Sequence, residues 1–320
     1  MTRRFDVAVM HDFFVDRLVH VESLGATTGM VMRKGKAGGG GVHGVRQEEL
    51  RGGNAVNLAH ALARLGLRTL LITHSDSAHR HLLESAFEGL DAELRVKSAA
   101  AGLTVAFEEK VNVMLGDGRG ASDFGPGLLD ESDWKALAAS KVVCSVNWAA
   151  NRQGTALLVA LRRRLGPEKP IYLDPADFRD NPRGFAALLR KVAEDDLVDW
   201  LSMNEVETAA AAAYLGISAG TLAVTCIEIA RKLGVVFDLH GAKVSCTSEG
   251  TRVCQAPVPR VRARRLTGAG DVWDAAAIFG RLRGLEEERR LRFANMAAKL
   301  YLEGADLLPP TAAEVLKALG

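Results

Sequence analysis

The chain has 320 residues, enough for one large α/β domain or for a core domain with a small accessory lobe. Hydrophobic residues make up 48% and charged residues 25%, a globular composition that excludes a disordered chain. The 41 basic and 39 acidic side chains give a formal net charge of +2. Proteins that bind nucleic acid or membrane surfaces carry a strong basic excess, so we expect neither as a partner.

Targeting and redox signals favour a cytoplasmic protein. No run of about 18 apolar residues predicts a transmembrane helix, and polar residues such as Asp12 interrupt the first apolar stretch, unlike in a secretory signal. The four cysteines form no C-x-x-C pair and favour reduced thiols. A bridge between Cys246 and Cys254 across a hairpin stays open.

Strands and helices alternate along the chain. A buried strand over 5–10 comes first, and short β-like pieces with glycines predict a lobe of exposed strands and loops over 12–49. A helix begins near Asn54 and ends at Gly66. Further helices are predicted over 79–87, 155–165, 185–192, 205–214, 222–232, after Gly270 and over 289–301, and further strands over 69–73, 104–114, 141–146, 171–173, 200–203, 235–239 and 260–265.

Strands that alternate with helices of this length form a parallel sheet covered on both faces. The chain has no internal repeat and no low-complexity linker. We therefore expect a single α/β domain over 1–320, with an inserted lobe formed by about 13–50 and 104–125.

The stretch Gly268-Ala269-Gly270-Asp271 precedes an apolar, alanine-rich helix. Small residues let backbone amides approach a ligand, and amides at a helix N-terminus form an anion site suited to phosphate. A carboxylate there repels phosphate, which makes sense if Asp271 takes a proton from an attacking hydroxyl. An aspartate that only caps the helix is the alternative, and the residues alone leave both open.

A second stretch, Gly52-Gly53-Asn54 with Asn57, stands at a predicted helix start. It can bring backbone and a carboxamide against a ligand hydroxyl, although it also fits an ordinary turn with an N-cap. In this order, the two stretches resemble the two sequence motifs of the ribokinase, or PfkB-type, family of carbohydrate kinases. Three further segments match family patterns: 174–179 (D-P-x-x-x-R), 204–207 (N-x-x-E) and 294–298, in the helix that lines the base pocket.

The resemblance implies a Rossmann-like α/β fold with a mostly parallel sheet, helices on both faces and a small β lid. It implies transfer of the terminal phosphoryl group of ATP or ADP, with Mg²⁺, to a hydroxyl of a sugar, sugar phosphate or nucleoside. Asp271 would be the general base, with Gly268, Ala269 and Gly270 as the anion hole. Asp12, Asp16, Gly53, Asn54 and Asn57 would bind the acceptor; Asp174, Asn204, His240, Gly241, Gly268, Gly270 and Asn295 the nucleotide; and Glu207 with Asn204 the hydrated metal.

Two departures leave details open. Residues 238–243 replace the usual T-x-G-x-x-G nucleotide loop, so ATP and ADP both remain donors to consider. Arg265-Leu266 stand where the family usually has Asp-Thr, which leaves a monovalent-cation site open. The G-x-G-x-x-G run at 39–44 lacks a preceding strand and a following helix, so it indicates a loop of the lid rather than a dinucleotide site.

The acceptor class has two interpretations. Lys34, Lys36 and His43 in the lid, with Arg152 beyond a predicted wall at Asn147, would suit an anionic acceptor such as a pentose phosphate. A nucleoside would need stacking aromatics, and only 6% of the residues are aromatic. Apolar residues in the lid strands predict a homodimer formed through the lid. A non-catalytic sensor of sugars or nucleotides on the same fold is the competing class.

Overall fold

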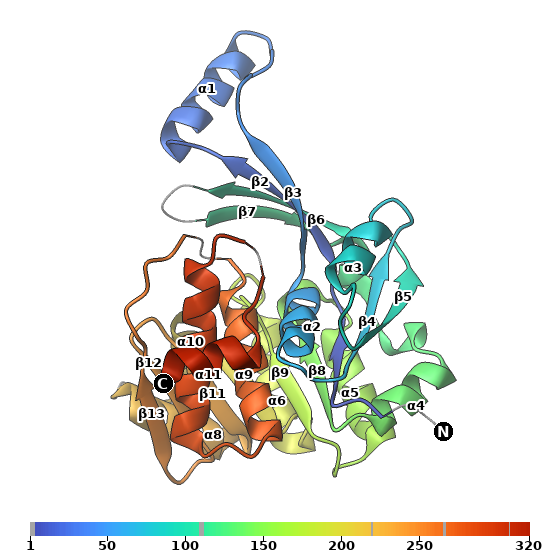
Figure 1. The fold of residues 1–320 in the computed structure, drawn as a ribbon, viewed down its shortest axis with the longest axis vertical. Coiled ribbons are helices and arrows are strands. Elements are labelled where there is room, and N and C mark those ends of the chain that lie inside the picture. Colours follow the sequence, from blue (N-terminus) through green and yellow to red (C-terminus); the bar gives the residue numbers. More distant parts are fainter. Residues whose placement is uncertain (1–3, 109–111, 219, 265–266, 307) are drawn as a thin grey trace.

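The computed structural model describes residues 4–108, 112–218, 220–264, 267–306 and 308–320. Its body is a nine-stranded sheet in the order β13-β12-β11-β10-β9-β8-β1-β4-β5 (Figure 1). Neighbouring strands from β11 to β5 run parallel, and β12 and β13 add an antiparallel edge. The strands are β1 (Val7–Met10), β4 (Thr69–Ser75), β5 (Ala92–Ser98), β8 (Val142–Val146), β9 (Ile171–Asp174), β10 (Trp200–Asn204), β11 (Val236–His240), β12 (Val244–Ser248) and β13 (Val253–Pro257).

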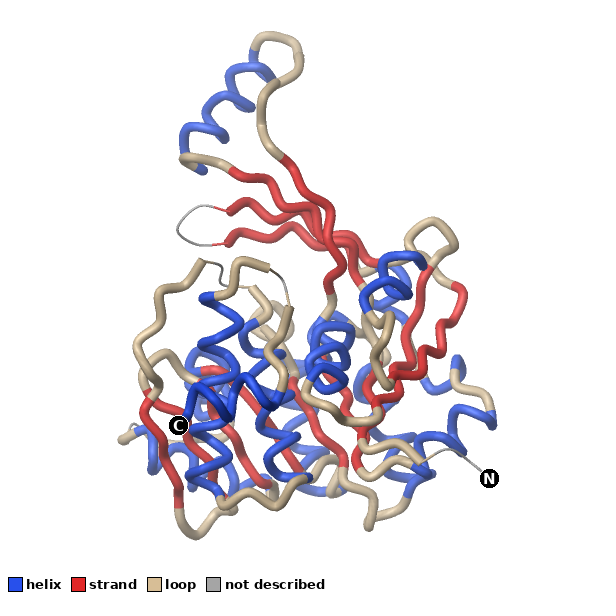
Figure 2. Tube along the Cα trace, viewed as in Figure 1, coloured by secondary structure: helices blue, strands red, loops and turns tan. Residues whose placement is uncertain are grey.

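Helices cover both faces of this sheet (Figure 2). One core contains residues of α4 (Glu131–Ala139), α5 (Gly154–Leu165), α6 (Pro182–Asp195), α7 (Glu205–Tyr214) and α8 (Leu222–Leu233). The other contains residues of α2 (Asn54–Arg64), α3 (Arg80–Ala86), α9 (Ala269–Leu282), α10 (Glu287–Glu303) and α11 (Ala312–Leu319). Along β1, Ala8 and Met10 face the first core and Val7 and Val9 the second, because successive side chains of a strand point to opposite faces. The predicted α/β architecture is confirmed.

A separate four-stranded sheet, in the order β3-β2-β6-β7, forms the lid. It contains β2 (Phe14–His20), β3 (Gln47–Gly52), β6 (Gly102–Glu108) and β7 (Asn112–Asp117). Strand β2 pairs parallel with β6 and antiparallel with β3. Because β2 follows the carboxyl end of β1 and β3 leads directly into α2, the lid is joined to the main sheet at its carboxyl edge (Figure 1).

The prediction of only strands and loops over 12–49 is wrong, since helix α1 (Leu24–Lys36) lies between β2 and β3. Ser23 caps it by accepting a hydrogen bond from the Ala26 amide at 3.2 Å. The helix projects from the lid away from the body (Figure 1), and none of its residues is buried. A helix that packs against no core needs no apolar face, so its sequence shows no helical period.

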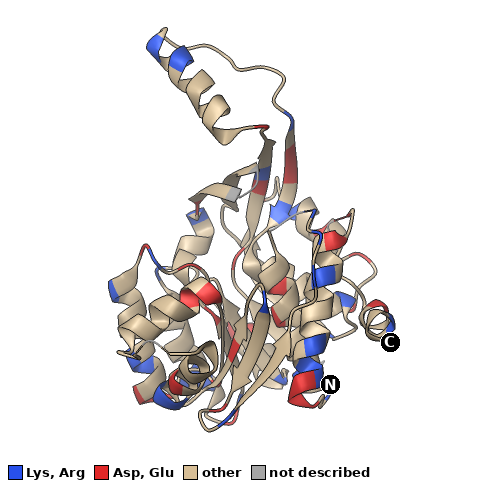
Figure 3. Cartoon of the chain, turned by 90° about the vertical axis from the view of Figure 1, so that its left-hand side faces the viewer, with Lys and Arg blue, Asp and Glu red and all other residues tan. Residues whose placement is uncertain are grey.

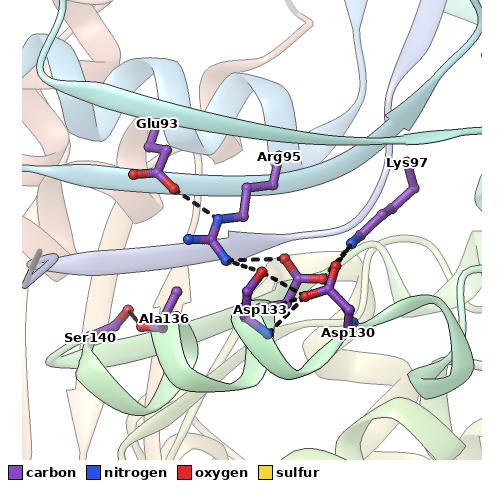
Figure 4. A network of polar contacts seen from close by, with 8 residues as sticks. Glu93, Arg95, Lys97, Asp130, Asp133, Ala136 and Ser140 are labelled. Carbon is purple, nitrogen blue, oxygen red and sulfur yellow. Dashed lines mark hydrogen bonds and ion pairs between the residues drawn. The ribbon is translucent and has the colours of Figure 1, made fainter. Parts of the chain in front are cut away.

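Three helices and strands of the body were also missed, namely β5, α4 and α11. Of these, β5 and α4 contact one another through charges (Figure 4). The Asp133 side chain is only 1% exposed and pairs with Arg95, at 3.2 Å, and with Lys97. Lys97 also donates to Asp130 at 3.0 Å. Residues 92–98 alternate apolar and polar side chains, the pattern of a half-buried strand, so β5 was predictable from the sequence.

The predicted strand over 260–265 is also wrong, because residues 260–264 form an irregular segment and residue 265 lies outside the described part. All four cysteines are free thiols. In the β12–β13 hairpin, Cys246 lies opposite Gln255 and Cys254 opposite Thr247, so no bridge joins the two cysteines. In the described ranges, we find no helix with the length and apolar character that a membrane crossing requires.

Candidate active site

Four buried carboxyl groups gather at the carboxyl edge of the main sheet, beneath the lid. Asp12 follows β1, Asp174 ends β9, and Asp271 and Asp274 lie in the first turns of α9. Their exposed fractions are 0%, 6%, 7% and 1%. The carboxyl ends of parallel strands are where open α/β sheets bind ligands, so this edge is the candidate site.

Asp12 holds the start of α2. Its carboxylate accepts hydrogen bonds from the backbone amides of Asn54 and Ala55, each at 2.9 Å, and from the Asn147 side chain at 2.8 Å. Gly53 has a φ of 99°, and a Cβ there would lie 2.8 Å from the Asp12 carbonyl oxygen. The Gly-Gly-Asn motif therefore lets α2 begin directly against Asp12.

Asp271 is the third residue of α9, and Asn57 of α2 donates to its Oδ2 at 3.0 Å. Burial raises the pKa of Asp271 well above its usual value, and the nearby Asp174 raises it further. Asn57 opposes this shift because its hydrogen bond favours the ionised carboxylate. Both residues were predicted as site residues, and the structure brings them into contact.

The start of α9 has the features of an anion site. Gly268 adopts a φ of 84°, which favours glycine, and no side chain caps the helix. The first amides of a helix have no partner within it, so those of Ala269, Gly270 and Asp271 can receive an anion. A Cβ at Gly268 would lie 2.8 Å from the Tyr301 hydroxyl, and one at Gly270 3.3 Å from the His240 ring.

On the lid, Asp16 of β2 lies against Gly52 of β3, where a side chain would clash with its carboxylate. Burial raises the pKa of Asp16 to about 6, although a hydrogen bond from Thr104 and the charge of Arg51 lower it. A cavity of about 750 Å³ opens beside this pair, between the lid strands and helices α2, α3 and α10. Asp16, Arg51, Asn57, His60, Gly268 and Tyr301 are among its lining residues.

Sequence reasoning missed Arg51, His60 and Tyr301 as residues of this cavity. Two signals were present in the sequence, because Arg51 directly precedes the Gly-Gly motif and His60 lies three residues after Asn57 on the same helix face. Tyr301, near the C-terminal end of α10, gave no such signal in the sequence. Its place opposite Gly268 depends on how α10 packs against α9.

The four cations predicted around one pocket are not together. Lys34 and Lys36 lie in the last turn of α1, at the free end of the projecting arm, where Figure 3 shows basic residues. Arg152 pairs with Asp123 at 2.6 Å, and both side chains are exposed. Neither Lys34, His43 nor Arg152 lines the cavity, so these residues give the anionic-acceptor interpretation no support.

The residues predicted to bind nucleotide and metal lie along the next strands of the same edge. Asn204 ends β10 and its side chain accepts the amides of Val206 and Glu207, each at 2.9 Å, while the Glu207 carboxylate accepts the Asn204 amide at 3.0 Å. Burial raises the pKa of Glu207 to about 7, and the charge of Asp174 adds to the shift. His240 ends β11 and its ring centroid lies 5.3 Å from that of Trp273.

Gly241 and Asn295 are enclosed. A Cβ at Gly241 would meet the Glu205 carboxylate and, at 2.8 Å, the Val244 carbonyl. The Asn295 amide accepts a hydrogen bond from the Trp273 indole at 2.8 Å and donates to the Pro257 carbonyl at 3.2 Å. Both ends of that amide are thus used in packing α9, α10 and β13 together.

A Mg²⁺ ion fits these residues through its waters. The described residues contain no set of three acidic, histidine or cysteine ligands arranged for direct coordination. Mg²⁺ usually keeps several waters and needs only one or two carboxylates besides substrate phosphates. Glu207, nearly buried and close to Asp174, is a carboxylate of that kind. Residues 265 and 266, where a monovalent-cation site was considered, lie outside the described part.

Three solved structures are similar over almost the whole chain. A ribokinase from Arabidopsis thaliana, complexed with ribose and ATP, has a TM-score of 0.77 and 22% identity over 99% of both chains. An adenosine kinase from Sinorhizobium meliloti has a TM-score of 0.80 and 15% identity, over 99% of this chain and 100% of that one. A putative ribokinase II from E. coli, in complex with ATP and Mg²⁺, has a TM-score of 0.78 and 14% identity, over 98% and 99%.

No curated protein matches the chain at a significant level. The model of the pfkB family carbohydrate kinases matches residues 20–310, which include both glycine motifs and the lid strands β3, β6 and β7. That match and the full-length structural similarity agree with the predicted α/β fold. The chain belongs to the PfkB, or ribokinase, family of carbohydrate kinases.

Proposed function

We propose that this kinase transfers the terminal phosphoryl group of ATP to a hydroxyl of a sugar or nucleoside, with Asp271 as the general base. One observation carries the proposal: a buried carboxylate stands in the first turn of an uncapped helix whose amides can receive an anion. Amides placed where negative charge develops stabilise the transition state, and a carboxylate of raised pKa beside them can accept the proton of the hydroxyl.

The similar structures support the choice of substrates. The first is complexed with ribose and ATP, the second is an adenosine kinase, and the third is in complex with ATP and Mg²⁺. The acceptor would lie between the lid and α2, where Asp16 and Asn57 line the cavity next to Gly268. Bound Mg²⁺ would neutralise phosphate charge, and Glu207 and Asn204 would hold its waters.

The lid would close the acceptor site from above. Its strands β2 and β7 fall within the proposed lid segments 13–50 and 104–125, whereas β3 ends at Gly52 and β6 begins at Gly102, just outside them. Excluding water strengthens each electrostatic interaction inside such a site. Asp12 would act mainly through α2, because its carboxylate already accepts two amides of that helix and the Asn147 side chain.

The test compares wild type with Asp271→Asn, using ATP and ADP as donors and D-ribose, ribose 5-phosphate and adenosine as acceptors. We expect Asp271→Asn to fold and bind ATP normally but to lose roughly 10²- to 10⁴-fold in turnover, the usual contribution of a general base. The matched control is Asp195→Asn, which removes an exposed carboxylate of α6.

A variant that retains turnover within about threefold of wild type would remove Asp271 from the role of base. Binding of nucleotide and sugar without any product, in wild type as in the variant, would favour the sensor alternative.

A further inference from the structure

A chain of hydrogen bonds joins the lid to the carboxylate of Asp271. Arg51, in the lid strand β3, donates through Nη1 to Asn57 Oδ1 at 2.9 Å. The other end of the same amide donates to Asp271 Oδ2 at 3.0 Å. The second guanidinium nitrogen of Arg51 contacts Nδ1 of His60, one turn further along α2. Strand β3 and helix α2, which follow one another in the sequence, are thereby connected to the distant helix α9.

This arrangement fixes which way the Asn57 amide points. A carboxamide offers an acceptor oxygen at one end and a donor NH₂ at the other. Arg51 can only donate, so it selects the orientation in which oxygen faces the lid and nitrogen faces Asp271. The reversed amide would place its oxygen against the Asp271 carboxylate and its NH₂ against the guanidinium, losing both hydrogen bonds.

Arg51 forms no ion pair with a carboxylate in the part of the chain that the structure describes. Burial lowers the pKa of Arg51, and the groups that act against this shift are Tyr301, Asp271 and Asp16. Its positive charge therefore faces the site. A guanidinium used only to anchor a strand is usually paired with a carboxylate or exposed, as Arg17 is on the same sheet, where it pairs with Glu49 at 2.9 Å.

The other groups around Asp271 act in the opposite direction. Asp174 from β9, Asp12 from the segment after β1 and Asp274 from α9 itself all favour the protonated form of Asp271. The Asn57 donor favours its ionised form. His60 is buried and its pKa is lowered to about 3, so it stays neutral at physiological pH and adds no charge.

We propose that Arg51 is a positioning residue that links the lid to the catalytic base: seated in β3, it orients the Asn57 amide so that this amide donates to Asp271 and keeps the carboxylate ionised. The inference rests on the proposed role of Asp271 as the base. With the lid strand displaced, Asn57 loses the partner that fixes its orientation, and Asp271 loses a hydrogen bond that its ionised form requires.

The experiment measures the ionisation of Asp271 without any acceptor. Aspartate side-chain carboxyl groups are labelled with ¹³C, and the Asp271 signal is assigned by its absence in Asp271→Asn. The midpoint of this signal is followed against pH in wild type, Arg51→Gln, Asn57→Leu and the double variant. Circular dichroism and the thermal unfolding midpoint check the fold of each, and Arg51→Met, of similar side-chain length, replaces Arg51→Gln if the latter does not fold.

We expect Arg51→Gln to raise the midpoint by roughly half to one pH unit, the scale of one lost hydrogen bond to a carboxylate. On the Asn57→Leu background the same change should add less than half of that shift, since its route through Asn57 is gone. Arg51→Lys, which can still donate to the Asn57 oxygen, should restore most of the wild-type midpoint. Arg17→Gln, which removes an exposed charge from the same sheet, should leave it unchanged.

An unchanged midpoint in Arg51→Gln overturns the inference, and so does a shift of equal size on both backgrounds, which would mean that Arg51 acts through its charge alone. The outcome is separate from that of the proposed function. If Asp271→Asn retains turnover, the base assignment fails whatever the titration shows. If it loses turnover while the midpoints fail to respond, only the role of Arg51 is withdrawn.

Discussion

Small residues decide how closely the polar groups of the site approach one another. Gly52 leaves room for the Asp16 carboxylate, and Gly53 brings α2 against Asp12. Gly268 and Gly270 leave room for the Tyr301 hydroxyl and the His240 ring at the start of α9. At each of these glycines a group from another element lies where a side chain would be. The packing around them therefore explains why glycine stands at these positions.

The metal role of Glu207 gives a residue-scale prediction. Glu207→Gln keeps the shape of the capping box, because the amide oxygen can still accept the Asn204 amide, but it removes a negative charge beside the expected Mg²⁺ site. We expect the magnesium concentration for half-maximal rate to rise several-fold, with little change at saturating magnesium. A magnesium titration of the steady-state rate measures this. An unchanged titration would leave Glu207 as a capping residue only.

At this scale the sequence predicted the residues that belong to short local motifs. Asp271, Gly268, Asn57 and Asn204 stand where a helix starts, and their neighbours in sequence are also their neighbours in space. Lys34 and Arg152 were grouped by charge and by their predicted places in the lid and after a strand end. The fold separates them because nothing in the sequence states the direction in which α1 projects. For charged residues that are far apart in the sequence, the sequence does not show how far apart they lie in space.

At the scale of elements, most amphipathic helices and buried strands of the body were predicted because their apolar period reports a core face, although β5, α4 and α11 were not. Helix α1 has no such face and was missed. A different kind of contact fixes α10, where Arg290 is fully buried and donates to both oxygens of Asp238 on β11, at 2.9 and 2.7 Å. Only the fold brings these two residues together.

The exposed apolar residues of the lid and of α1 lead to a prediction of the oligomeric state. Val113, Met114 and Leu115 of β7 are exposed, as are Met30, Val31 and Met32 of α1. An edge strand with exposed apolar residues offers unpaired backbone groups and apolar surface to a second copy. We therefore expect a homodimer formed through the lid.

Multi-angle light scattering at assay concentration measures the mass, and Leu115→Ser should weaken the dimer. Leu316→Ser, which removes another exposed apolar residue, from α11 at a distance from the lid, is the control. A monomeric wild type, or equal dissociation of both variants, would contradict a dimer formed through the lid.

At the scale of the whole molecule, the buried titratable groups link stability to pH. Burial raises the pKa of Asp16 to about 6 and those of Glu207 and Asp274 to about 7. Burial also lowers the pKa of His11 to about 4 and that of His60 to about 3. A carboxyl group of raised pKa binds its proton more tightly in the folded state, so its contribution to stability falls as pH rises toward the folded pKa. The histidines act in the opposite sense, because their neutral forms are favoured by folding and stability is lost as pH falls below about 6.5.

The two groups oppose one another between about pH 4.5 and 6.5, and above that range only the carboxyl groups still titrate. The free energy of unfolding of the unliganded protein should therefore decrease between pH 6.5 and 8.

Asp274→Asn removes one of these carboxyl groups. Its amide oxygen can still accept a hydrogen bond from the Ser202 hydroxyl, which lies 2.7 Å from the Asp274 carboxylate in the wild type. We expect this variant to lose less stability over that interval than wild type, by about 1 kcal/mol, the scale of a one-unit pKa shift. Urea unfolding at pH 6.5 and 8 measures the difference, with Asp195→Asn as a control that should follow wild type. An equal loss in Asp274→Asn and wild type would mean that Asp274 does not ionise in the folded protein over this range, and the pH dependence would then have to arise from the other buried carboxyl groups.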